Sequence, residues 1–261
     1  MAHDHMIEML DLDAEVLQDY HRDLVAWVAR EAPAHPRVVD LGAGSGTGAL
    51  ALARELPDAT VTAVDVDPDM LAHVGAKASA AGLGDRIRTL VADLDQPWPD
   101  LGPTDVIWAA SSMHHMADPA GALRSAFNAL AVGGLLVIAE LDSFPHFLTG
   151  TPDEAVEKRA HAEVARLREE AGMHMHENWK DRISAAGFPS VTEQRFDIDL
   201  RAPLPASAAR YAEVTLGRMH DRLSDRLPAS DLAALEKATA TLADRDDLSV
   251  RTTRTVWLAR R

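Results

Sequence analysis

The feature that most constrains this chain is an apolar run that passes directly into alternating glycines. Residues 37–41 read Arg-Val-Val-Asp-Leu, and residues 42–48 read Gly-Ala-Gly-Ser-Gly-Thr-Gly. Glycine adopts positive φ without a Cβ penalty, and its missing side chain lets another group lie against the main chain. A buried strand, a glycine turn and a helix start in this order are typical of α/β proteins with a parallel sheet. The segment therefore predicts a turn at which a ligand approaches bare backbone.

The next apolar run, residues 60–64, ends at an acid, Asp65. An acid at the tip of the second strand is placed to accept both hydroxyls of a ribose. The alternative is that Asp65 caps the following helix, but Asp67 already stands before Pro68 and can serve as that cap. The residues therefore favour a nucleoside ligand.

The glycine spacing distinguishes between two kinds of adenosine cofactor. A dinucleotide fold requires Gly-x-Gly-x-x-Gly. Counted from Gly42 that pattern fails at Thr47, and counted from Gly44 it survives only in the weaker form with Ala49. The pattern that fits is Asp-x-Gly-x-Gly-x-Gly, which begins at Asp40. The ligand is therefore expected to be an adenosine compound other than a dinucleotide.

Five motifs in the right order resemble those of the class I S-adenosylmethionine-dependent methyltransferases, of the small-molecule type. They are residues 40–46, 64–71, 92–94, 105–116 and 130–138. The resemblance implies an α/β fold, namely a Rossmann-like, doubly wound sheet of seven strands with helical lid insertions. It also implies S-adenosylmethionine as the cofactor.

The resemblance assigns cofactor-binding roles to Asp40, Gly42, Ala43, Gly44, Gly46, Asp65, Val66, Asp93, Leu94 and Ser111. Asp40 and the amides of the glycine turn are expected to hold the methionine end of the cofactor. Val66 is expected to lie against the adenine, and Asp93 to accept from the adenine amino group with the Leu94 amide at a ring nitrogen. The alternative for Asp93 is a turn residue ahead of Gln96 and Pro97.

Two histidines follow the fourth expected strand, where the family's loop borders the methyl group and the substrate. His114 and His115 are the candidate catalytic bases, because histidine titrates near neutral pH. The alternative is a packing or loop-fixing role. Asp142 and His146, which follow the fifth strand, are the candidate substrate-binding residues. The resemblance leaves open whether a general base is used at all.

The pattern beyond the motifs predicts a single methyltransferase domain over residues 1–261. A helical segment (1–36, with an amphipathic helix over 13–31) precedes the cofactor-binding core (37–141), and residues 177–202 and 246–261 complete the core. Residues 142–176 and 203–245 are helical insertions, the first beginning with a capping box at Thr151. They are interpreted as a lid over the substrate, the alternative being simple packing elements. Residues 252–259 are expected to form the last, antiparallel strand at the sheet edge.

Charge and composition exclude several functions. The 41 acidic residues outnumber the 26 basic residues, and the net charge of −15 argues against a nucleic-acid substrate. No run approaches the roughly 18 apolar residues of a membrane helix, and the N-terminus lacks the features of a signal peptide, so a cytoplasmic protein is expected. No metal is expected, because His3 with His5 and His174 with His176 are spaced by two and share no helix face.

These observations predict transfer of a methyl group to an O or N atom of a small-molecule acceptor, with specialised metabolism as the expected setting. A homodimer is one expected assembly. The alternatives are a peptide or protein methyltransferase and a non-catalytic cofactor-binding protein of the same fold.

Overall fold

The structure is a computed structural model that describes residues 2–261, with side chains from residue 5 onward. The chain divides into two compact units. One comprises the residues up to Gln18 with residues 141–173 and 197–254, and the other comprises residues 19–140, 174–196 and 255–261. We call them the helical unit and the core unit. Of the helices in the described range, none is both long and apolar enough to cross a membrane.

Within the described residues, seven strands form one sheet: β1 (Arg37–Leu41), β2 (Thr60–Asp65), β3 (Ile87–Val91), β4 (Thr104–Ala110), β5 (Leu130–Leu141), β6 (Ser190–Leu200) and β7 (Val250–Arg260). Their order is β3-β2-β1-β4-β5-β7-β6, and β1 to β5 pair in parallel. β1 lies between β2 and β4, and all but its first residue are buried. The chain leaves β1 towards β2 on one side and returns at β4 on the other. The carboxyl ends of β1 and β4 therefore form the switch point at which such sheets bind ligands.

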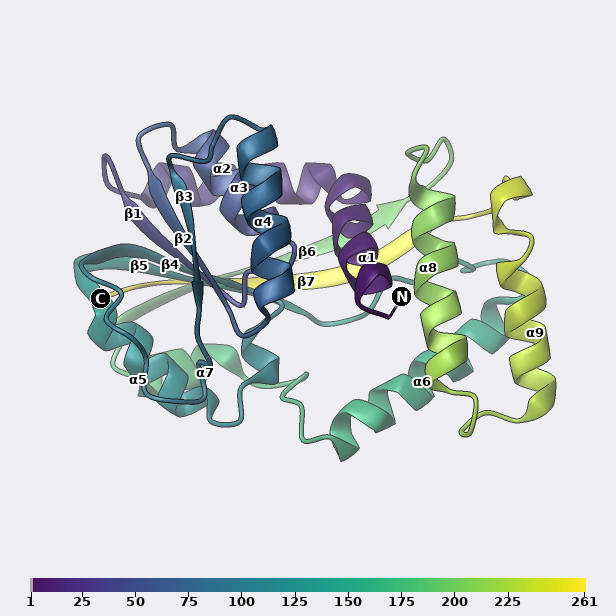
Figure 1. Cartoon of the computed structure of the whole chain (residues 1–261). Helices are drawn as coiled ribbons and strands as arrows, with labels where there is room; N and C mark the ends of the chain where they lie inside the picture. Colours follow the sequence, from purple (N-terminus) through teal and green to yellow (C-terminus); the bar gives the residue numbers. More distant parts are fainter. Residues whose placement is uncertain (1) are drawn as a thin grey trace. The chain divides into compact units, whose positions relative to one another are not determined.

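Helices cover both faces of the strands in the core unit. Figure 1 shows α2 (Gln18–Glu31), α3 (Thr47–Glu55) and α4 (Pro68–Ala80) on one face, and α5 (Pro119–Ala129) and α7 (Trp179–Ala185) on the other. The Asp67 carboxylate accepts from two backbone amides at the start of α4. The Asp118 carboxylate accepts from one at the start of α5. Each aspartate precedes a proline at the first helical position, so the cap expected at Asp67 is confirmed and Asp118 caps α5 in the same way.

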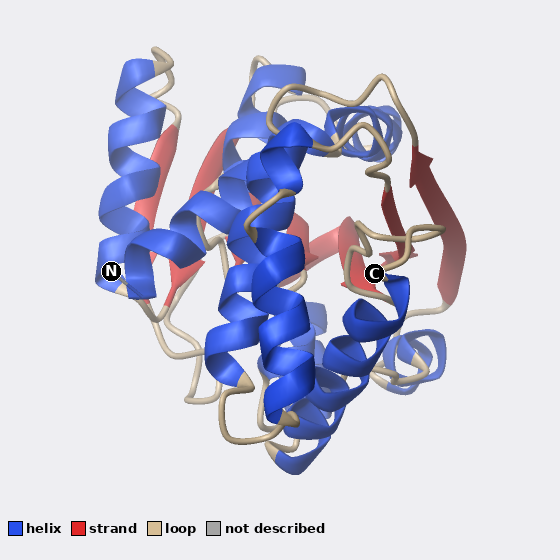
Figure 2. Cartoon of the chain, turned by 90° about the vertical axis from the view of Figure 1, so that its right-hand side faces the viewer, coloured by secondary structure: helices blue, strands red, loops and turns tan. Residues whose placement is uncertain are grey.

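The helical unit contains α1 (Ala2–Val16), α6 (Glu154–Glu170), α8 (Ala208–Arg222) and α9 (Ala229–Thr239). α8 contacts the other three, and Figure 2 shows helices of this unit packed side by side. The Asp13 carboxylate accepts from the Tyr211 hydroxyl at 2.5 Å and from the Arg254 guanidinium at 2.7 Å, and so joins α1, α8 and β7. The expected insertions, residues 142–176 and 203–245, fall within this unit apart from residues 174–176.

Three sequence expectations about these elements are wrong. The N-terminal helix starts at Ala2 and breaks at Leu17. It begins earlier than expected because Met6, Ile7, Met9 and Leu10 carry half-buried apolar side chains that extend the helical pattern. The first insertion helix starts at Glu154, since the Thr151 hydroxyl donates to the Leu148 carbonyl in a turn and caps no helix.

The last strand is also not at the edge of the sheet. β7 lies between β5 and β6, and β6 is the edge strand. Its antiparallel direction is confirmed, because the Gly133 amide donates to the Arg261 carbonyl and the Asp142 amide to the Thr253 carbonyl. The burial patterns agree with this order, since β7 is buried along most of its length and β6 is mostly exposed.

Candidate active site

The glycine turn is fixed by backbone hydrogen bonds to the end of β2. We call residues 42–46 the glycine loop. Its three glycines have positive φ: 67° at Gly42, 51° at Gly44 and 83° at Gly46. The Gly42 and Ala43 amides donate to the Val64 carbonyl at 2.8 and 2.9 Å. The Gly44 amide donates to the Asp65 carboxylate at 2.8 Å. The loop conformation therefore requires glycine, and the acid at the tip of β2 helps to hold it.

The glycines are also required because the fourth strand and its following loop press against them. A Cβ on Gly42 would lie 2.6 Å from the Cβ of Ser112. A Cβ on Gly48 would lie 2.6 Å from Nε1 of Trp108 and 2.9 Å from Oδ2 of Asp40. Real Cβ atoms do not approach this closely, so the bare backbone is needed for packing within the protein as well as for a ligand.

Asp40 is buried against the start of α3, with 1% of its surface exposed. Burial raises its pKa to about 7, the charge of Asp65 adds to the rise, and a hydrogen bond from the Ala49 amide opposes it. Its Oδ2 atom is buried without a hydrogen-bond partner among the described residues. A buried carboxylate oxygen with no donor is costly, so this site suits a cationic or N–H donor. The observation fits the amino group of the cofactor's methionine end.

The surface beside Asp65 is apolar and uncovered. Val66 is 64% exposed and Val91, which pairs with Asp65 in the β2/β3 register, is 58% exposed. Oδ1 of Asp65 accepts from the Asp67 amide at 3.0 Å, and each carboxylate oxygen retains capacity for a further donor. A carboxylate flanked by two exposed valines fits a ribose with its adenine ring.

Asp93 and Leu94 lie just beyond the end of β3. The exposed Asp93 accepts from the Asp95 amide at 3.0 Å and its carbonyl accepts from the Gln96 amide, which is the turn geometry of the alternative interpretation. Leu94 is buried, and its carbonyl accepts from the Trp98 indole at 3.0 Å. Contacts of these two residues with adenine remain a prediction.

The loop after β4 is strained where it meets the glycine loop. Ser111 has a φ of 53°, which is rare for a side chain other than glycine. Its amide donates to the Ala139 carbonyl at 2.7 Å, and this bond holds the loop against β5. Strain of this kind persists only where the surrounding structure enforces it, and it is frequent at functional sites.

Glu140, at the end of β5, organises the candidate base. Its carboxylate lies 2.5 Å from Nδ1 of His114 and accepts from the amides of Met113 and His114 at 2.9 and 3.3 Å. Glu140 is 3% exposed and His114 is 4% exposed. His115 is exposed, and its ring centroid lies 4.2 Å from that of His114. A buried carboxylate thus orients the imidazole of His114.

The structure sorts the predicted site residues into the two units. The predicted cofactor residues and both candidate bases lie in the core unit, at the carboxyl ends of its parallel strands. Asp142 and His146 belong to the helical unit, where His146 lies beside Glu157 and His161. His174 pairs with Glu177 at 2.8 Å.

Sequence reasoning missed two residues of this site. Glu140 is the one charged residue in the apolar run of β5, and an acid at the end of a buried parallel strand is the signal that could have identified it. Val91 carries no signal, because an apolar residue at the end of an apolar strand is expected to be buried.

Comparisons with known proteins agree with this geometry. A family model described as a methyltransferase domain matches residues 38–134. The 27-O-demethylrifamycin SV methyltransferase of Amycolatopsis mediterranei is 30% identical over 192 residues, which cover 70% of each chain. The demethylmenaquinone methyltransferase of Thermus thermophilus is 38% identical over 127 residues, which cover 48% of this chain and 56% of that enzyme.

A likeness to solved structures supports the fold. The YcgJ protein of Bacillus subtilis superposes with a TM-score of 0.56 at 20% identity, over 93% of this chain and 99% of that one. The sequence motifs, the fold and the relative matched over 70% of its length all point to the same family. The chain belongs to the class I S-adenosylmethionine-dependent methyltransferases, and it is an enzyme that uses S-adenosylmethionine as its cofactor.

Proposed function

We propose that this enzyme transfers the methyl group of S-adenosylmethionine to an O or N atom of a small-molecule acceptor in specialised metabolism. The observation that carries the proposal is the continuous edge formed by Asp40, the glycine loop and Asp65. Asp40 offers an unpartnered buried carboxylate oxygen and the glycine loop offers bare backbone, which suit the methionine end of the cofactor. Asp65 offers a carboxylate beside exposed valines, which suits the ribose and the adenine. A relative named for an O-demethylated rifamycin supports a small-molecule acceptor, and so does the net charge of −15.

The residues of this chain bind and orient the cofactor, which supplies an electrophilic methyl group on a sulfonium when bound. Asp40 and the glycine loop would hold the methionine end, and Asp65 the ribose. Much of the catalysis in such a displacement comes from placing the nucleophile in line with the methyl group and excluding water. The helical insertions in residues 142–173 and 203–245 are proposed to form the lid that does so.

His114 is proposed as the base that removes a proton from the acceptor. When its Nδ1–H donates to Glu140, Nε2 carries the lone pair and can accept a proton. The carboxylate also stabilises the imidazolium that results. His115 is the alternative base, and substitution distinguishes between the two histidines. With His114 as the base, His114→Gln should lower turnover by about a hundredfold or more, whereas His115→Gln should retain it.

Binding and turnover test the proposal separately. Calorimetry should show that S-adenosylhomocysteine binds and that a nicotinamide dinucleotide does not. Asp65→Ala should weaken the binding of S-adenosylhomocysteine while the fold is retained. Incubation with S-adenosylmethionine and a panel of phenols, alcohols and amines, read by mass spectrometry, should show one added methyl group on a small molecule. Methylation of peptides alone would favour the peptide or protein alternative. Cofactor binding without any methylated product would favour the non-catalytic alternative.

A further inference from the structure

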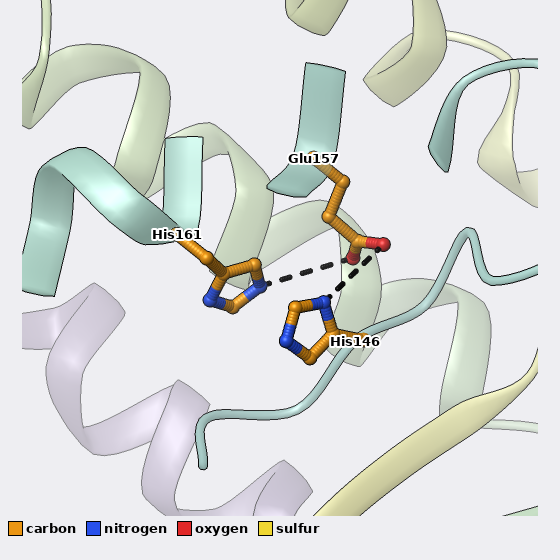
Figure 3. Close-up of side chains that lie close together, drawn as sticks. All are labelled: His146, Glu157 and His161. Carbon is orange, nitrogen blue, oxygen red and sulfur yellow. Dashed lines mark ion pairs between the residues drawn. The ribbon is translucent and has the colours of Figure 1, made fainter. Parts of the chain in front are cut away.

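Three side chains with metal-binding atoms converge in the helical unit. None of them is among the residues assigned to the cofactor. His146 comes from the segment after β5, and Glu157 and His161 are one turn apart on α6 (Figure 3). Their ligand atoms all lie within 4.8 Å of one another. Nδ1 of His146 is 3.9 Å from Oε2 of Glu157, and Nε2 of His161 is 4.0 Å from Oε1.

Backbone amides fix the position of the Glu157 carboxylate. Glu157 has no exposed surface, and its two oxygens accept from the amides of Phe147 and Leu148 at 2.6 and 2.9 Å. Each oxygen has a second lone pair, which remains available. The amides also place His146, because it directly precedes Phe147 in the chain. Glu157 therefore holds the segment that carries one histidine, and shares α6 with the other.

The hydrogen bonds of His161 determine which of its nitrogen atoms carries the lone pair. His161 bonds the backbone of Pro145, which has no amide hydrogen, so the imidazole must donate to the Pro145 carbonyl. Nε2 is buried without a hydrogen-bond partner in the described part of the chain. Nδ1 is therefore the donor, and Nε2 presents its lone pair towards Glu157.

The two imidazoles and the carboxylate thus face one another at distances too long for a hydrogen bond between them. From this arrangement we propose that His146, Glu157 and His161 bind a divalent transition-metal ion of the zinc class. Two imidazoles and one carboxylate are a frequent ligand set for zinc. The bond from His161 to the Pro145 carbonyl is the outer contact that metal-binding histidines usually make.

The geometry requires a small closure on metal binding. With zinc bonds of about 2.0–2.2 Å, tetrahedral ligand atoms lie about 3.3–3.6 Å apart. The pairs at 3.9 and 4.0 Å, which involve the two different oxygen atoms of Glu157, must therefore each approach by roughly half an ångström. Rotation of the His146 side chain, which is 27% exposed, can close the first pair, and the side-chain torsions of His161 and Glu157 must close the second. The same exposure leaves the fourth position open to water or to an oxygen atom of a ligand. Three protein ligands with one open position is the arrangement of a reactive rather than a purely structural zinc site.

Metal analysis of the full chain tests this proposal. The starting protein carries His3→Ala and His5→Ala, so that the N-terminal histidines contribute no binding. After chelator treatment and dialysis against Zn²⁺, elemental analysis should find one zinc ion per chain, and Co²⁺ should give visible absorption bands from coordinated metal. His161→Gln and His146→Gln should each weaken zinc binding at least about tenfold, because even outer-contact changes typically cost 10–100-fold.

His220→Gln is the matched control, because His220 lies in the same unit, on α8, and pairs with Asp221. It should leave zinc affinity unchanged. Circular dichroism of each variant establishes that it is folded, and two histidine variants guard against one failing to fold. Absence of retained zinc, or zinc affinity equal to that of the starting protein in both His161→Gln and His146→Gln, would overturn the proposal.

Discussion

Asp40→Asn should remove the part of the pH dependence of unfolding free energy that comes from ionising the buried Asp40 carboxyl group. In the unfolded chain Asp40 ionises near its ordinary pKa of 3.8, whereas burial raises the pKa in the folded protein to about 7. Between these values the folded state retains a proton that the unfolded state has lost. Stability therefore falls as pH rises through this window and levels off above pH 7. Asparagine has a similar shape and no charge, so the variant lacks this component.

The magnitude follows from the two pKa values. One pKa unit corresponds to about 1.36 kcal/mol, so the full effect is about 4 kcal/mol. Roughly 2–3 kcal/mol of this is lost between pH 5 and pH 8, because ionisation is already under way in the unfolded chain at pH 5. Urea denaturation of the protein without cofactor should show that Asp40→Asn gains this amount relative to the wild type when the pH is raised from 5 to 8.

Asp105→Asn is the control for the Asp40 experiment. A hydrogen bond from Arg37 lowers the pKa of Asp105, so this carboxylate is ionised in both the folded and the unfolded chain at pH 5 and at pH 8. Any change in stability caused by Asp105→Asn should be the same at the two pH values. If the Asp40→Asn and wild-type stabilities change in parallel between pH 5 and pH 8, Asp40 ionises in the fold without penalty and the reasoning is refuted.

Three further predictions concern the same edge of the sheet. Gly82 and Gly42 have similar φ values, 69° and 67°, but a Cβ would meet nothing within 4 Å at Gly82. Gly82→Ala should cost about 1–2 kcal/mol from backbone strain alone. Gly42→Ala should cost about 1–3 kcal/mol more from overpacking against Ser112, and equal costs by urea denaturation would show that the contact is easily relieved. Glu140→Gln should lower turnover about tenfold or more at unchanged S-adenosylhomocysteine affinity, since it weakens the partner of His114; full turnover would limit Glu140 to a structural role. Asp65→Ala should reduce S-adenosylhomocysteine affinity by calorimetry and also loosen the glycine loop, and Asp65→Asn, which retains one acceptor oxygen, should be less impaired.

The sequence predicted those parts of the fold that local chemistry determines. The glycine loop was predicted because positive φ and close backbone contact both require glycine, and the start of α4 because Asp67 precedes a proline. The position of β7 was not predicted, because its neighbours in the sheet come from distant parts of the chain. β7 is buried on both faces because it lies between β5 and β6. Its sequence mixes apolar and polar residues, so the sequence alone does not indicate a central strand.

The same limit explains why the candidate site was only partly predicted. His146 was noticed because it follows β5, but its neighbours Glu157 and His161 read as ordinary residues of an amphipathic helix, four positions apart on one face. Their chemistry depends on Phe147 and Leu148, whose amides anchor the Glu157 carboxylate, and no spacing in the sequence encodes that contact. The role of Glu140 likewise depends on contacts with another segment, the loop that carries His114. Acids that are buried and bound to the backbone of another segment are therefore the residues for which a structure adds most to a sequence of this family.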